Sequence, residues 1–219
     1  RTCDTAGVLE TIGAEELFQM ARHGARVVHT PAAELALGSG IPLRVRNTFS
    51  DHPGTRVADL RSYTPAGVAT AVSHSGGITR VVVTLPAAEG TTEHMAAQAY
   101  IYRTMADVGV SLDMFTPVGE TLVFTVPDAA VDSACDVLDT LGLAHVVTGG
   151  LAKVTLIGAG MHGVPGVMAR MAGYLAEAGV HILQTADSHT TISALIPTEE
   201  CDSAVKALHE GVGLGAPGC

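Results

Sequence analysis

Apolar and polar positions follow an order that occurs twice in the last two-thirds of the chain. The first occurrence predicts strand 78–85, helix 91–107, strand 110–116, strand 121–126, helix 128–140 and strand 145–148. The order βαββαβ is typical of a ferredoxin-like unit, in which two helices cover one face of a four-stranded antiparallel sheet. The pattern therefore predicts an α+β fold.

The second occurrence predicts strand 152–157, helix 164–178, strand 181–186, strand 190–196 and helix 198–210. Gly109-Val110 and Pro127 return 70 residues later as Gly179-Val180 and Pro197, which indicates a tandem of similar units. No fourth strand follows the last helix of this second unit. An apolar stretch at residues 68–73 precedes the first unit, and we expect it to complete the second sheet, because an unpaired edge strand favours aggregation.

The first 58 residues have a different pattern. They predict helix 14–22, a short helix 32–37 and strand 43–47. Two helices and one strand cannot bury a core, so we expect this stretch to be the closing part of a larger domain. The given sequence would then be a fragment that lacks the beginning of that domain. The expected organisation is an incomplete domain at 1–58, a linker and strand at 59–77, and two similar domains at 78–150 and 151–219.

Composition narrows the possible partners. The net charge of −10 argues against a nucleic acid or an anionic membrane. The four cysteines, Cys3, Cys135, Cys201 and Cys219, have no Cys-x-x-Cys spacing, so neither a zinc site nor a disulfide framework is predicted. No apolar run approaches 18 residues and no signal peptide is recognisable, which leads us to expect a cytoplasmic protein.

One motif invites a nucleotide-binding interpretation. Residues 158–163 read Gly-Ala-Gly-Met-His-Gly, a literal G-x-G-x-x-G between a predicted strand and a predicted helix, with Asp187 as the ribose-binding acid. A dinucleotide fold needs a parallel βαβ crossover, whereas here the next two strands are separated only by Asp187, Ser188 and His189, which predicts a hairpin. We therefore reject a dinucleotide site.

The same loop remains a candidate ligand site, because it leads into a helix N-terminus whose backbone N–H groups can hold a carboxylate. The alternative is that Gly158 and Gly160 only allow close packing of strand and helix. His162 and His189 are candidate partners for a ligand carboxylate, while two histidines are too few for a metal site. The candidate residues are Met161, His162, Gly163, Val164, Pro165, Gly166, Thr185, Asp187, Ser188 and His189, with Asp113 of the first unit as a further candidate for a ligand amine.

Several stretches carry a family resemblance. Residues 158–161 (Gly-Ala-Gly-Met), 165–169 (Pro-Gly-Val-Met-Ala) and 175–180 (Leu-Ala-Glu-Ala-Gly-Val) resemble the second ACT domain of aspartate kinases. Residues 184–192 (Gln-Thr-Ala-Asp-Ser-His-Thr-Thr-Ile) are similar to the diaminopimelate-responsive members. Residues 24–29 and 41–46 resemble the end of the family's catalytic domain, so the resemblance covers the chain in order.

The resemblance implies tandem ACT regulatory domains preceded by the remnant of an α/β amino-acid-kinase domain. Its parent enzyme would phosphorylate the β-carboxylate of aspartate with ATP and Mg²⁺, at the entry to lysine, threonine, methionine and diaminopimelate synthesis. The family's main catalytic motifs are not in this sequence, so no catalytic residue is assigned and this stretch is expected to be inactive alone. The implied partners are an amino-acid effector (diaminopimelate, lysine or threonine) and a second copy that forms a homodimer through the ACT domains.

The sequence departs from the family pattern at three places. Residues 30–32 (Thr-Pro-Ala) stand where the family usually has an arginine, residues 86–91 replace a D-x-P-G loop, and residues 112–115 lack a Gln-Asn pair. These departures leave the effector open. They also leave two alternatives: a free-standing amino-acid-binding module, and a tandem that only dimerises, which the missing loop favours.

Overall fold

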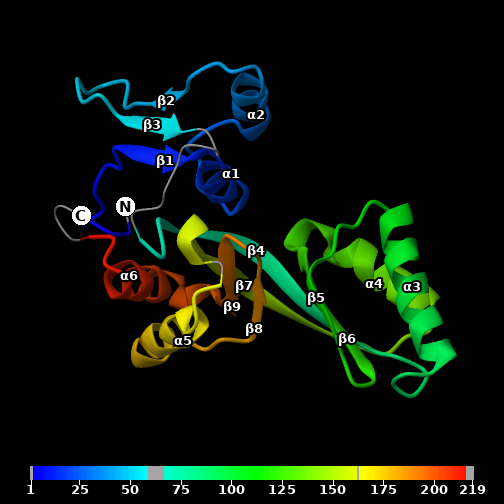
Figure 1. Cartoon of the computed structure of the whole chain (residues 1–219). Helices are drawn as coiled ribbons and strands as arrows, with labels where there is room; N and C mark the ends of the chain where they lie inside the picture. Colours follow the sequence, from blue (N-terminus) through cyan, green and yellow to red (C-terminus); the bar gives the residue numbers. More distant parts are fainter. Residues whose placement is uncertain (1, 59–66, 162, 216–219) are drawn as a thin grey trace. The chain divides into compact units, whose positions relative to one another are not determined.

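The computed structural model describes residues 2–58, 67–161 and 163–215 (Figure 1). The chain forms two compact units, one of Arg1–Ser75 with Lys153–Cys219 and the other of Gly76–Ala152. Among the helices in these described ranges, none combines the length and apolar character needed to cross a membrane.

The unit Gly76–Ala152 has the predicted ferredoxin-like arrangement. Its strand order is β5-β6-β4-β7, and β6 pairs antiparallel with both β4 and β5. Its strands are β4 (Ala71–Thr84), β5 (Asp113–Val118), β6 (Thr121–Pro127) and β7 (His145–Ile157), and its α-helices are α3 (Thr92–Asp107) and α4 (Val131–Thr140). Val81, Phe124 and Met105 lie fully buried between sheet and helices. Alternate apolar residues of β4 and β6 supply this core, as the period of two predicts.

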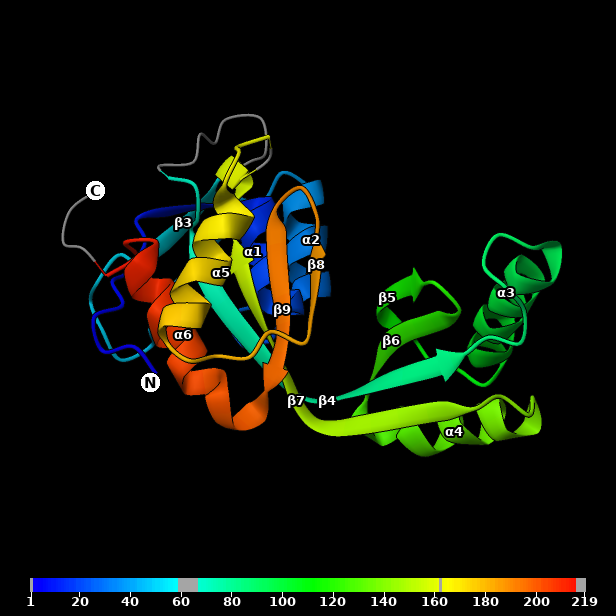
Figure 2. The ribbon, with the colours of Figure 1, turned by 90° about the horizontal axis from the view of Figure 1, so that it is seen from below.

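Strands β4 and β7 belong to one six-stranded sheet of order β5-β6-β4-β7-β9-β8, in which β9 (Thr191–Pro197) pairs beside β7 and β8 (Gln184–Asp187) is the last strand. β4, which begins at Ala71, lies beside β7 and is the fourth strand of this part of the sheet. The Thr70 N–H, just before β4, donates to the Ile157 carbonyl at 2.7 Å. Helices α5 (Val167–Glu177) and α6 (Cys201–Gly211) run side by side against this sheet (Figure 2).

The structure corrects several predicted boundaries. Strands 68–73 and 78–85 are one strand, β4, which continues through Gly76-Gly77, and strands 145–148 and 152–157 are likewise one strand, β7, which continues through Gly149-Gly150. Both predicted breaks lie at glycine pairs, and Gly77 and Gly150 adopt positive φ angles of 73° and 72° within continuous strands. Helix α5 begins at Val167, three residues later than predicted, because turn residues precede it. Strand β8 begins at Gln184, three residues later than the predicted strand, because residues 181–183 form a loop.

The upstream residues contain more strands than predicted. β1 (Thr11–Gly13) pairs parallel with β3 (Thr55–Ala58), which pairs antiparallel with β2 (Arg44–Val45). Two helices, α1 (Ala14–Arg22) and α2 (Thr30–Gly38), accompany this sheet. Ile12, Leu17 and Val57 form a small buried cluster between them. The prediction of one strand in this stretch was wrong, because strands of three and four residues are too short to show a period.

The end of α1 lies against the sheet that carries β7 and β9. Thr155 of β7 places its hydroxyl oxygen 2.9 Å from Ser193 Oγ and 3.4 Å from His23 Nδ1, and His23 caps α1. Thr155 and Ser193 are both buried. The sheet behind α5 and α6 is therefore covered on its other face as well, which explains why β9 is buried along nearly its whole length.

Candidate functional site

A pocket with a volume of about 640 Å³ lies at the start of α5. Its lining residues come from the loop that contains the Gly-x-Gly-x-x-Gly motif of residues 158–163 (the glycine loop), from the beginning of α5, and from the turn between β8 and β9. They are Met161, Gly163, Val164, Gly166, Val167, Met168, Asp187, Ser188, His189 and Ile192. Seven of the sequence candidates thus meet at one place, and the volume is within the range of small-molecule sites, roughly 300–1,000 Å³.

The N-terminus of α5 is open to a ligand. Gly166 is the N-cap residue with a φ of 85°, and as a glycine it has no side chain with which to cap the helix. The first N–H groups of an α-helix have no acceptor within the helix, and they carry the positive end of the helix dipole. Val167 and Met168, whose amides belong to this first turn, line the pocket. A ligand carboxylate would find donors here.

Three backbone N–H groups of the glycine loop are engaged by acceptors within the protein. The N–H of Gly158 donates to the Thr190 carbonyl at 2.9 Å, and that of Ala159 donates to Glu16 Oε1 at 2.9 Å. The N–H of Met161 donates to the Gly158 carbonyl at 3.3 Å. These three loop amides are therefore already paired within the protein, and the first-turn amides of α5 remain as candidate donors for a ligand carboxylate.

Close backbone packing explains the two glycines. A Cβ on Gly158 would overlap the Val68 carbonyl oxygen and lie 2.7 Å from Ala69 Cα, and a Cβ on Gly160 would overlap the Gly67 carbonyl oxygen. Neither glycine adopts a positive φ. Both glycines thus allow close packing, but against the backbone of residues 67–70 and not between strand and helix as the alternative supposed.

The turn after β8 forms the other side of the pocket. Ser188 is engaged within this turn: its hydroxyl oxygen lies 2.8 Å from Thr191 Oγ1, and its N–H donates to the Thr191 carbonyl at 2.8 Å. Asp187, at the end of β8, is exposed and lines the pocket. A carboxylate is therefore available for a ligand amine while the serine holds the turn.

Four candidates lie elsewhere or outside the description. Thr185 and Pro165 are exposed and do not line the pocket. Asp113 belongs to the other unit, where its carboxylate accepts the Met114 N–H at 2.9 Å. His162 lies outside the described residues.

Three lining residues were not predicted. Val167, Met168 and Ile192 add apolar surface to the pocket. The near-helical spacing of Met168 with Met161 and Met171 is typical of residues in a core. Its 38% exposure instead leaves it at the surface beside the pocket.

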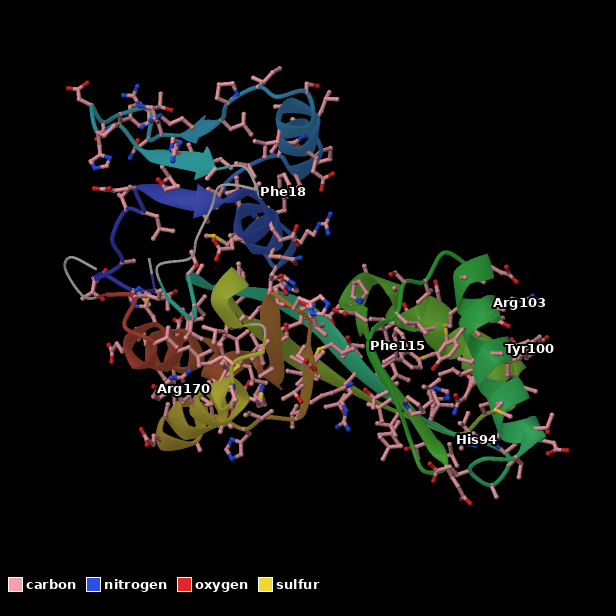
Figure 3. All side chains as sticks on the ribbon, viewed as in Figure 1. Phe18, His94, Tyr100, Arg103, Phe115 and Arg170 are labelled. Carbon is pink, nitrogen blue, oxygen red and sulfur yellow. The ribbon has the colours of Figure 1, made fainter. Side chains whose placement is uncertain are left out.

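The corresponding helix of the other unit is already capped. Thr91 Oγ1 accepts the His94 N–H at 3.2 Å, and the buried His94 ring places Nδ1 3.0 Å from the Ala87 carbonyl oxygen and Nε2 2.7 Å from Gln98 Nε2. Figure 3 shows His94 at the start of α3 and Arg170 on α5. Thr91 and His94 therefore stabilise the loop that precedes α3 and the first turn of that helix. The N-cap residue of α5, Gly166, has no side chain that could do the same.

A charged contact joins the loop before β8 to the turn before α6. Glu200 accepts the His181 N–H and lies close to His181 Nδ1, both at 2.6 Å. These hydrogen bonds from His181 lower the pKa of the Glu200 carboxyl below its ordinary value. Within the described part of the chain, His, Cys, Asp and Glu side chains form no group of three that could bind a metal.

Comparisons with known proteins agree on one family. A family model for the ACT domain matches residues 146–210. Aspartokinase 1 of Bacillus subtilis is 34% identical over 215 residues, which cover 96% of this chain and 52% of that protein. The chain thus spans about half the length of the curated relatives it matches.

Solved structures give the same fold. Aspartate kinase from Clostridium acetobutylicum aligns with a TM-score of 0.88 at 19% identity, over 97% of this chain and 51% of that chain. The regulatory subunit of aspartate kinase from Thermus thermophilus aligns with a TM-score of 0.58 at 24% identity, over 66% of this chain and 98% of that chain. Aspartokinase III of E. coli, solved with lysine and aspartate, aligns with a TM-score of 0.72 at 22% identity, over 94% and 46% respectively.

Proposed function

Since the chain belongs to the aspartokinase family and carries its ACT-bearing regulatory part, we propose that its pocket senses an amino-acid end product for an aspartate kinase. One observation carries the choice of site. The uncapped start of α5 and the carboxylate of Asp187 line the same pocket of about 640 Å³. An anion-binding group and a cation-binding group in one pocket fit the two charges of an amino acid.

The recognition can be assigned group by group. The ligand α-carboxylate is held by the first-turn amides of α5, and the ammonium pairs with Asp187. Met161, Val164 and Ile192 provide apolar contact for the aliphatic part of the ligand. Diaminopimelate, lysine and threonine all have these groups, and we propose that the effector is one of these three. The resemblance of residues 184–192 to diaminopimelate-responsive enzymes makes diaminopimelate the first to test.

We propose the following division of the chain. Residues 1–58 are the end of an amino-acid-kinase domain, residues 59–77 are a linker and strand, and residues 78–150 and 151–219 are two ACT domains. The position of residues 71–75 beside β7 supports a crossover in which the linker segment completes the last sheet. The ACT-domain match at 146–210 falls almost entirely in the last segment.

The parent enzyme proposed for this regulatory part transfers phosphate from ATP, with Mg²⁺, to L-aspartate and forms 4-phospho-L-aspartate in the cytoplasm. No residue of this chain is assigned to that chemistry. The effector would act by binding one arrangement of the protein more tightly than another, because a ligand shifts a conformational equilibrium only by its differential affinity.

We also propose a homodimer formed through the ACT domains. The edge strand β5 carries the exposed apolar side chains Phe115 and Val118, and Val146 and Val147 of β7 are exposed as well. Exposed edge strands offer unpaired backbone groups and apolar surface to a second copy. Light scattering coupled to gel filtration tests this proposal: twice the chain mass supports it, and the single chain mass contradicts it.

The sensing function is tested by isothermal titration with meso-diaminopimelate, L-lysine and L-threonine in turn. At least one probe should bind saturably, and Asp187→Asn should weaken that binding by about tenfold to a hundredfold, which is the loss of a charge-assisted hydrogen bond. Glu177→Gln is the matched control, because it removes the same charge at the exposed other end of α5. If none of the probes binds, a dimerisation scaffold without a ligand becomes the better account.

A further inference from the structure

Glu16 is the most deeply buried acidic residue in the described chain, with 0% exposure. It lies in the first turn of α1 and belongs neither to the pocket nor to the sequence candidates. Burial of a carboxylate is costly unless several donors satisfy it. The identity of those donors indicates what Glu16 does.

Three donors from three segments meet at the Glu16 carboxylate. Oε1 accepts the Thr70 hydroxyl at 2.6 Å and the Ala159 N–H at 2.9 Å, while Oε2 accepts the Gly13 N–H at 3.2 Å. Thr70 and Ala159 lie 54 and 143 residues away in the sequence. One side chain therefore ties together the start of α1, the segment before β4 and the glycine loop.

The glycine loop leads directly into the pocket. Ala159–Met161 form one 3-10 turn, and Met161, itself buried, lines the pocket. The neighbouring Gly158 N–H binds the Thr190 carbonyl, which belongs to the turn on the other side of the pocket. The position of the pocket wall is thus set by hydrogen bonds to Glu16 on one side and to Thr190 on the other.

We propose that Glu16 is a positioning residue of the pocket: its carboxylate fixes the glycine loop against α1, so that pocket occupancy and the start of α1 are coupled. The ligand part of this inference rests on the proposed sensing function. The contact gives the pocket a direct connection to the upstream residues, because the same carboxylate accepts from the backbone at the N-cap of α1. A ligand that orders the loop would also order this helix end.

The test compares Glu16→Ala, Glu16→Gln and Glu15→Ala in the full chain by amide hydrogen exchange. Glu15 is a matched control: it stands beside Glu16 in α1, and its carboxylate accepts from Gln19 of its own helix. We expect the Ala159 amide to exchange at least about tenfold faster in Glu16→Ala than in Glu15→Ala, the factor that corresponds to about 1.4 kcal/mol. In Glu16→Gln the effect should be smaller, because the amide oxygen can still accept from Ala159.

The exchange of α6 amides separates positioning from general destabilisation. Leu208 is fully buried in α6, so faster exchange there in Glu16→Ala reports loosening of the whole unit, whereas unchanged exchange shows a local effect. If Glu16→Ala unfolds the unit, Glu16→Gln decides in the same way. Equal Ala159 exchange in the Glu16 and Glu15 variants, or acceleration that is equal at Ala159 and Leu208, would overturn the proposal.

A second arm adds saturating meso-diaminopimelate, L-lysine or L-threonine. In the unmodified chain a bound probe should slow exchange at Ala159 and at the Gly13 amide, and in Glu16→Ala the slowing at Gly13 should be lost. Slowing at Gly13 that survives in Glu16→Ala contradicts the coupling. If no probe binds the unmodified chain, the sensing function fails by itself, and the exchange of Ala159 without ligand still decides the role of Glu16.

Discussion

Replacing Gly158 by alanine tests why the glycine loop has its sequence. The added Cβ would overlap the Val68 carbonyl oxygen and approach Ala69 Cα to 2.7 Å and Thr70 N to 3.2 Å. All three are backbone atoms, so no side chain can rotate away and the segment before β4 must move. Overpacking of this kind costs about 1–3 kcal/mol, against a gain of about 0.4–1 kcal/mol from a less flexible unfolded chain.

The net expectation for Gly158→Ala is a loss of about 1–2 kcal/mol in the free energy of unfolding. For a chain of this size that corresponds to a decrease of about 2–8 °C in the melting temperature. The decrease is measured by thermal and urea denaturation followed by circular dichroism. It requires no ligand, because the argument concerns backbone packing alone.

Gly173→Ala provides the control of opposite sign. Gly173 lies inside α5 and a Cβ there meets nothing within 4 Å, so alanine should stabilise the protein by roughly 0.5–1 kcal/mol through its higher helix propensity. The reasoning is refuted if Gly158→Ala is as stable as the unmodified protein, or if the two alanine variants change stability in the same direction.

Two further predictions concern the end groups of helices and loops. Thr91→Ala removes the hydroxyl that accepts the His94 N–H at the start of α3. Urea denaturation should show a loss of about 0.5–2 kcal/mol in the stability of the Gly76–Ala152 unit. The control Thr92→Ala, one residue into the helix, should have a smaller effect. The pKa of the Glu200 carboxyl is lowered in the folded state, so its carboxylate stabilises the protein above the ordinary pKa of 4.5 and loses that contribution as the pH falls through the folded pKa. The melting temperature of Glu200→Gln should therefore change less with pH in this acidic range than that of the unmodified protein. Identical melting-temperature curves against pH would contradict this prediction.

The sequence predicted the order of the elements in the tandem well, because the alternation of apolar and polar residues along strands such as β4 and the helical spacing in α5 are local signals. It misplaced the long strands, since Gly76-Gly77 and Gly149-Gly150 have the composition of turns. A glycine with positive φ can lie within a strand when neighbouring strands continue to pair with it. That depends on long-range contacts, which a local pattern does not contain.

The candidate site was also predictable only in part. The glycine loop and the hairpin residues Asp187, Ser188 and His189 were found from their place next to a helix start. The hydrogen bonds of the loop amides could not be found from the sequence, because two of their acceptors, Glu16 and Thr190, are distant from the loop in sequence. Glu16 itself had no local signal beyond an ordinary acidic residue in the first turn of a helix.

The most direct test of the account is an NMR titration of the backbone amides with whichever of meso-diaminopimelate, L-lysine and L-threonine binds. The account predicts that the largest shift changes fall on Gly163, on Gly166 to Met168 and on Asp187 to His189, with little change at residues 86–94 around the capped start of α3. Changes centred on residues 86–94, or no changes with any of the three probes, would contradict the assignment of the sensing pocket to α5.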